Sequence, residues 1–168
     1  RNWGLVFCGN FAGALTTAFM MSFILTYGYS VDGGAIADKV GAIGEGRTLG
    51  YKEHGLSGWF TIFIRGMLCN WMVSMGVVGA MISTSAGSKM MAMWMPVMLF
   101  FFMGFEHSIV NMFLFPFSMI MGGDFTVVDY LIWNEIPTVL GNLVGGFLFV
   151  GLPLYLTHVR TSPERQIV

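Results

Sequence analysis

Four segments of this sequence contain almost no charged residues. Within their interiors, the only charged or imidazole side chains are Arg65, Glu106 and His107. About 20 consecutive apolar residues are enough to cross the hydrocarbon core of a bilayer as a helix. The pattern therefore predicts an all-α membrane protein whose helices span the bilayer at residues 3–29, 57–82, 90–121 and 135–157.

The third segment is too long for one straight crossing. As a single helix, residues 90–121 would extend about 48 Å, whereas the hydrocarbon core is about 30 Å thick. Glu106 lies at the midpoint, between Gly104 and His107. We expect a break near 104–107, where two half-helices would expose backbone N–H groups able to bind an anion. If the helix resumes there, Asn111 lies on the same face as His107.

Composition supports a membrane location. Hydrophobic residues make up 55% of the 168 positions and charged residues 10%, and the mean hydropathy is +0.72. A soluble domain carries about 25% charged residues. The net charge of −1, with no basic tract, argues against a nucleic-acid partner.

Basic residues favour one orientation. An even number of spans puts both termini on one side, and the short segments on that side have the higher density of Lys and Arg, which favours cytoplasmic termini in a plasma (inner) membrane. They contain Arg1, Lys89, Arg160 and Arg165, against Lys39, Arg47 and Lys52 in a longer loop opposite.

The first and fourth segments share a motif. Asn precedes a Gly-Asn pair by seven residues in both, followed by GxxxG spacing: Asn2 with residues 9–13, and Asn134 with residues 141–145. These two segments cross in opposite directions, as in the inverted repeats of transport folds. We expect two further helices ahead of Arg1, which gives six spans in all.

Each polar residue within a span has a structural and a functional interpretation. For Glu106 we favour a structural role, either protonated or hydrogen-bonded to free backbone. For His107 we favour a functional one, because ionisable residues inside membranes mark functional sites. The remaining candidates have structural alternatives, namely interhelical hydrogen bonds, snorkelling, solvation or packing: Asn10, Asn70 and Asn142; Arg65; Lys52; and Phe100 with its two neighbours.

These motifs resemble the formate/nitrite transporter family. The most specific match is residues 104–113, Gly-Phe-Glu-His-Ser-Ile-Val-Asn-Met-Phe. Supporting matches are residues 2–10, residues 69–73 and residues 136–146. The resemblance covers helices three to six of the family's six. The amino-acid sequence of residues 69–75 and 133–146 most resembles that of nitrite-type members.

The resemblance implies an aquaporin-like fold of two inverted three-helix repeats, with a pore in each subunit of a homopentamer. Its substrates would be formate, nitrite and hydrosulfide, passing with protons across the lipid bilayer. The family's central histidine falls on His107 and its glutamate on Glu106. The pore asparagines, constriction residues and vestibule lysine fall on the following positions: Asn70 and Asn142; Phe100 and Val73; and Lys52. The first two helices, which face the histidine, lie outside this sequence.

The resulting hypothesis is that Lys52 attracts the anion, apolar side chains strip its water, and His107 hydrogen-bonds it or shares a proton. The alternatives are an intramembrane enzyme and a tetraspan scaffold without transport. Enzyme chemistry is disfavoured because the motifs for zinc hydrolysis, serine catalysis and haem ligation are missing from the spans. We therefore predict a transporter rather than an enzyme, without cofactor or metal.

Overall fold

The computed structural model describes residues 2–161, in which every regular element is a helix. Arg1 and Arg165, on which part of the predicted orientation rests, lie outside the described residues. Three helices are long and apolar enough to cross a membrane, and two shorter apolar helices lie between them. The long ones are α1 (Asn2–Leu25), α4 (Gly55–Ile82) and the continuous helix Val127–Arg160, and the short ones are α5 (Ala86–Phe102) and α6 (Ser108–Ile120).

The continuous helix alternates between α-helical and π-helical turns. Pro137 and Pro153 each lie near the start of an α-helical stretch, where the absence of a backbone N–H is tolerated. Its consecutive stretches are α7 (Val127–Tyr130), η1 (Leu131–Glu135), α8 (Ile136–Gly146), η2 (Phe147–Gly151), α9 (Leu152–Tyr155) and η3 (Leu156–Arg160).

The third predicted span is broken, as the sequence indicated. Helix α5 ends at Phe102 and α6 begins at Ser108, with an irregular segment between them. Gly104 has a φ of 65°, in the left-handed region that only glycine enters at low cost. His107 is extended, with φ −124° and ψ 116°. The chain therefore leaves the helix at a glycine and re-enters it directly after the histidine.

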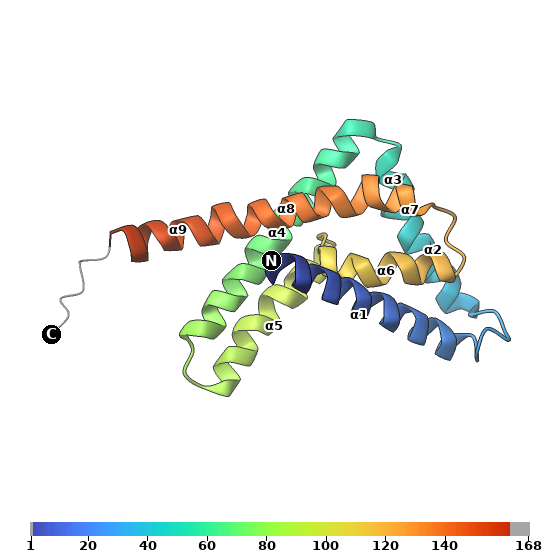
Figure 1. The fold of residues 1–168 in the computed structure, drawn as a ribbon, viewed down its shortest axis with the longest axis horizontal. Coiled ribbons are helices and arrows are strands. Elements are labelled where there is room, and N and C mark those ends of the chain that lie inside the picture. The colour runs from blue at the N-terminus through green and yellow to red at the C-terminus, as the bar shows by residue number, and fades with distance from the viewer. Residues whose placement is uncertain (1, 162–168) are drawn as a thin grey trace.

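Helices α4 and α8 cross at close range (Figure 1). The GxxxG pair of α8 makes this possible, because a Cβ at Gly141 would overlap the Phe63 carbonyl and one at Gly145 would overlap that of Met67. This is the use of GxxxG spacing that the sequence predicted.

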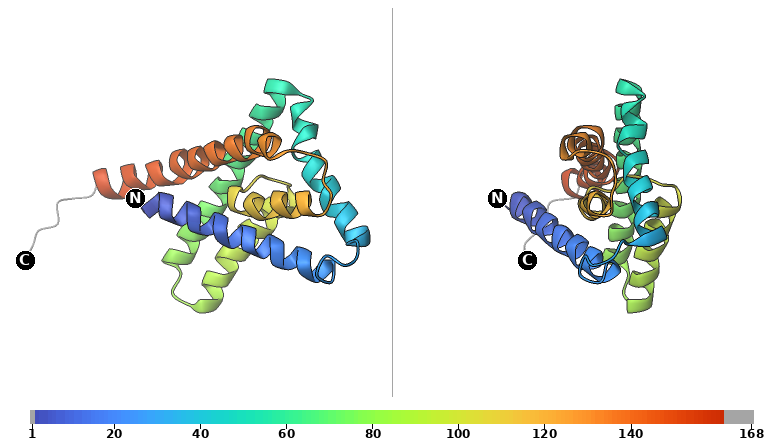
Figure 2. Two further views of the ribbon diagram at one scale, coloured as in Figure 1. Left: turned by 45° about the vertical axis from the view of Figure 1, so that its right-hand side comes forward. Right: turned by 90° about the vertical axis from the view of Figure 1, so that its right-hand side faces the viewer.

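The matching motif in α1 has an open surface. Helix α1 packs against α6 and runs opposite to α8 (Figures 1 and 2), in agreement with an inverted repeat. Only Ala18 and Ser22 of α1 are buried. Among residues 2–161, a Cβ at Gly9 or Gly13 would meet no atom within 4 Å. The GxxxG surface of α1 is therefore free to receive another helix.

The long polar loop contains helices that the sequence pattern did not predict. Helices α2 (Gly34–Gly46) and α3 (Leu49–Lys52) lie between α1 and α4, and α2 packs on α6. The Ser118 hydroxyl donates to the Val40 carbonyl at 3.0 Å, and Gly44 is buried against the same serine. This packing brings Arg47, just after α2, to the break between α5 and α6.

Candidate functional site

Asn142 of α8 holds the break together. Its amide nitrogen donates to the carbonyl oxygens of Glu106, at 3.0 Å, and Gly66, at 2.9 Å. Its amide oxygen accepts from the Ser108 backbone N–H at 3.1 Å. A broken helix leaves backbone groups without partners, which is costly where water is excluded. Asn142 supplies partners on both sides of the break.

Ser108, the first residue of α6, is also held by its side chain. Its hydroxyl donates to Glu135, a buried residue that also accepts from the Tyr130 hydroxyl at 2.9 Å. The N-terminus of α6 is thus bonded to two residues of the 127–160 helix, Glu135 and Asn142. It is less open to an anion than the sequence suggested, because the Ser108 N–H is already occupied.

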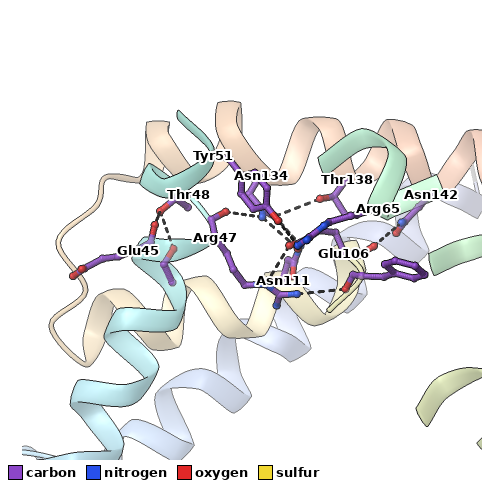
Figure 3. A network of polar contacts seen from close by, with 12 residues as sticks. Glu45, Arg47, Thr48, Tyr51, Arg65, Glu106, Asn111, Asn134, Thr138 and Asn142 are labelled. Carbon is purple, nitrogen blue, oxygen red and sulfur yellow. Dashed lines mark hydrogen bonds and ion pairs between the residues drawn. The ribbon is translucent and has the colours of Figure 1, made fainter. Parts of the chain in front are cut away.

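Glu106 is fully buried and surrounded by donors. Its Oε2 accepts from the amide nitrogens of Asn111, at 3.0 Å, and Asn134, at 3.3 Å. Its Oε1 lies 3.1 Å from Arg47 Nε, as an ion pair without the alignment of a hydrogen bond. Figure 3 shows these side chains converging on the glutamate. Groups that only donate suit a carboxylate acceptor. Glu106 therefore has a structural environment built by side chains rather than by free backbone.

Asn134 ties this network to the loop. Its amide oxygen accepts from Asn111 at 2.7 Å, and its amide nitrogen donates to the Arg47 carbonyl at 2.9 Å. The sequence comparison had marked Asn134 only as the first residue of a repeat. Its partners come from α6 and from the loop after α2, so its role is visible only in the folded chain.

His107 lines a cavity of about 310 Å³ at the break. The imidazole stacks on Phe100, with ring centroids 5.7 Å apart. Its Nδ1 is buried and has no hydrogen-bond partner among residues 2–161, and the same is true of Asn111 Oδ1. The cavity walls include Arg47, Arg65, Phe100, His107, Val110 and Asn111. Two unpartnered polar atoms beside an aromatic wall form a site where a small polar species could be bound.

Three predicted pathway residues lie away from this cavity. Asn70 donates to the Asn142 carbonyl at 2.6 Å and lines a separate apolar pocket with Trp3. Val73 is half-buried on α4. Lys52 is exposed and pairs with Asp129, at 2.7 Å between Nζ and Oδ1. The structure thus brings His107, Phe100 and Asn111 together and places the other three elsewhere.

The structure adds two arginines to the site. Arg65, for which the sequence favoured snorkelling, and Arg47, counted only as a loop charge, both line the His107 cavity. The Arg65 guanidinium donates to the Tyr51 hydroxyl. Burial, followed by the charge of Glu106, raises the pKa of Tyr51, so this hydroxyl stays neutral. The sequence did contain a signal for Arg65, because it is a charged residue inside a predicted span. It contained no such signal for Arg47, which lies in a polar loop.

A buried polar site at a broken helix in an apolar bundle is characteristic of membrane transport proteins. Within the part of the chain that the structure describes, no three side chains of His, Cys, Asp or Glu cluster as a metal-ligand set. The polar groups at the break are amides, a carboxylate, guanidinium groups and an imidazole.

Known proteins place the chain within this class. Residues 1–156 match the formate/nitrite transporter family. The chain is 33% identical over 165 residues to a probable formate transporter of Methanothermobacter thermautotrophicus, covering 95% of this chain and 60% of that protein. It is 30% identical over 181 residues to the formate channel FocA of Escherichia coli K12, covering 96% and 60%.

A solved structure has the same fold. The pentameric formate channel with formate bound has a TM-score of 0.76 and 30% identity, over 93% of this chain and 65% of that one. The chain spans about 60% of the length of the relatives described above. It belongs to the formate/nitrite transporter family and is an integral, multi-pass membrane protein. Family membership favours transport over the enzyme alternative.

Proposed function

We propose that this chain forms part of a pore for small monovalent anions, formate and nitrite, and that His107 meets the anion at the break between α5 and α6. The observation that carries the proposal is the imidazole of His107, which lines the cavity at the break and whose buried Nδ1 has no hydrogen-bond partner among residues 2–161. Formate is the ligand named for the related channels. Nitrite enters the proposal as a second substrate because the family that the chain matches is described as formate/nitrite transporters.

The mechanism follows from the cost of moving charge through an apolar constriction. An anion without its water is heavily penalised there, whereas the neutral acid is not. Phe100 is buried and stacked on His107, so an anion that reaches the imidazole meets an apolar surface at the same point. His107 then hydrogen-bonds the anion or shares a proton with it. Asn111 Oδ1 can accept the O–H of the protonated acid.

The remaining predicted pathway residues fit supporting positions. Asn142 and Asn70 keep the break in shape through their hydrogen bonds. We place Val73 at a constriction formed with segments beyond this chain. We place Lys52 at the mouth of the pathway, where it forms an ion pair with Asp129. We expect all of these residues to belong to one transmembrane domain of six spans.

The assembly and its orientation are part of the same proposal. The solved relative is pentameric, and α1 exposes apolar side chains on most of its surface, which supports a homopentamer in the membrane. The positive-inside pattern supports cytoplasmic termini in the plasma membrane. Native mass spectrometry of the purified protein tests the first, and labelling of single cysteines in intact cells tests the second.

Uptake of labelled formate by liposomes containing the full-length protein tests the role of His107. We expect His107→Phe to lower uptake about tenfold or more, which is the value of one hydrogen bond to a charged group, and to flatten its dependence on pH. His54→Phe, in the exposed residue that precedes α4, should leave both unchanged. Uptake with the original rate and pH profile in His107→Phe would exclude the proposed role. The absence of anion flux in the unmodified protein would favour the scaffold alternative.

A further inference from the structure

The two arginines of the cavity and Lys52, the predicted anion-attracting residue, differ in their partners. Lys52 Nζ lies 2.7 Å from Asp129, and Arg47 Nε lies 3.1 Å from Glu106. Arg65 has no carboxylate oxygen within 4.0 Å in the chain from residue 2 to 161. Two of the three positive charges are therefore compensated locally, and the third is not.

Arg65 is held toward the cavity by a neutral group. Its Nη1 donates to the Tyr51 hydroxyl, and its guanidinium carbon lies 5.7 Å from the centroid of the same ring. Figure 3 shows Arg65 and Tyr51 next to the Glu106 network. The side chain is half-buried and lines the cavity that contains His107. A guanidinium group remains charged at all accessible pH values.

The charges around the cavity leave a surplus. The charged residues that line the cavity are Arg47 and Arg65. Arg47 is paired with Glu106, so Arg65 leaves the lining of the cavity with a formal charge of about +1. We infer that Arg65, rather than Lys52, draws the anion into the His107 cavity and selects planar anions with two oxygens. The inference rests on the proposed function and identifies the residue that confers its charge and shape preference.

The chemistry of arginine supplies the selectivity. A planar guanidinium group donates two parallel N–H bonds to a carboxylate, whereas an ammonium group acts as a point charge. Formate and nitrite both present two oxygens in a plane, and hydrosulfide does not. Arg65 therefore favours the first two over the third. A narrow site with one sign of charge also raises the rate of anion entry by 10- to 1,000-fold, an effect that salt screens.

The test measures initial formate uptake by the full-length protein in liposomes, below saturation, at ionic strengths of about 0.01 M and about 1 M. We expect Arg65→Gln to lower uptake about tenfold at the lower ionic strength and to remove most of the salt dependence. Lys39→Gln removes one positive charge from the exposed surface of α2 and should behave like the unmodified protein.

A conservative variant separates charge from shape. Arg65→Lys should keep the salt dependence of formate uptake, while competition by hydrosulfide becomes several-fold stronger because the planar pair of donors is lost. Tyr51→Phe should keep the salt dependence as well, since Arg65 and its charge remain. These two variants keep the inference testable even if Arg65→Gln does not fold.

Several results would overturn the inference while leaving anion transport intact. One is Arg65→Gln with the uptake and salt dependence of the unmodified protein. Another is loss of the salt dependence in Lys52→Gln instead, which would assign the attraction to Lys52. A third is unchanged competition by hydrosulfide in Arg65→Lys. By contrast, an unmodified protein that takes up no formate would contradict the proposed function itself.

Discussion

The buried carboxylate of Glu106 gives the sharpest prediction about stability. Glu106 has no exposed surface, and the Arg47 side chain is 25% exposed. At 3.1 Å, two unit charges attract by about 5 kcal/mol with an effective dielectric constant near 20. Because water reaches Arg47, part of this attraction is replaced when the pair is broken. We expect the coupling free energy between the two side chains to be about 2–3 kcal/mol.

A double-mutant cycle measures this coupling. Glu106→Gln should lower the free energy of unfolding by about 3 kcal/mol, because an amide cannot accept from all the donors that surround the carboxylate. Arg47→Gln should lower the free energy of unfolding less in the Glu106→Gln variant than in the unmodified protein. Unfolding in mixed micelles, followed by far-ultraviolet circular dichroism, provides the four free energies.

An exposed carboxylate provides the control for this cycle. Glu53→Gln, on the surface, should change the free energy of unfolding by less than about 0.5 kcal/mol. A coupling free energy below about 0.5 kcal/mol between positions 47 and 106 would refute the assignment of Arg47 as the partner that stabilises the buried charge.

Three further changes can be followed by thermal unfolding in detergent. Asn142→Leu leaves the Glu106 carbonyl and the Ser108 N–H without partners and should cost about 2 kcal/mol. An unchanged melting temperature would contradict the role of Asn142 in holding the break together. Gly141→Ala places a methyl group against an α4 carbonyl and should cost about 1–3 kcal/mol, whereas Gly46→Ala, with open space around it, should not destabilise. Lys52→Gln removes an exposed ion pair and should cost less than about 1 kcal/mol; a larger loss would show that this pair supports the fold.

The broken span was predictable because its signals are local. Excess length, a glycine and two ionisable residues all fall within a few positions of one another, and the structure breaks at residues 103–107. The GxxxG pair at Gly141 and Gly145 was predictable for the same reason, since helical spacing alone puts both glycines on one face. Each feature depends on short-range geometry that the sequence records directly.

The partners of the buried glutamate were not predictable in this way. Arg47 reaches Glu106 because α2 folds onto α6, and the contact joins residues far apart in the chain. Charge counting treats Arg47 as a solvated loop residue. Asn134 was recognisable as half of a repeat, but its bonds to Asn111 and to the Arg47 carbonyl depend on where three elements meet.

The environments of Lys52 and Arg65 were not predictable either, because they also depend on contacts between distant parts of the chain. Nothing in the sequence around Lys52 signals that Asp129 neutralises it, because the two residues come together only when α3 lies beside α7. The sequence did not decide the direction of the Arg65 side chain, since a long side chain inside a span can either extend to the surface or face a cavity. In the folded chain Arg65 lines the cavity and donates to the Tyr51 hydroxyl.

The central claim is that the Nδ1 atom of His107 contacts the transported anion. Solid-state NMR of the full-length protein in liposomes, with ¹⁵N-labelled histidine, measures this directly once the His107 signal has been assigned by its loss in His107→Gln. Addition of formate should shift the His107 Nδ1 resonance in a saturable manner. A resonance that does not move, in vesicles that demonstrably take up formate, would contradict the claim.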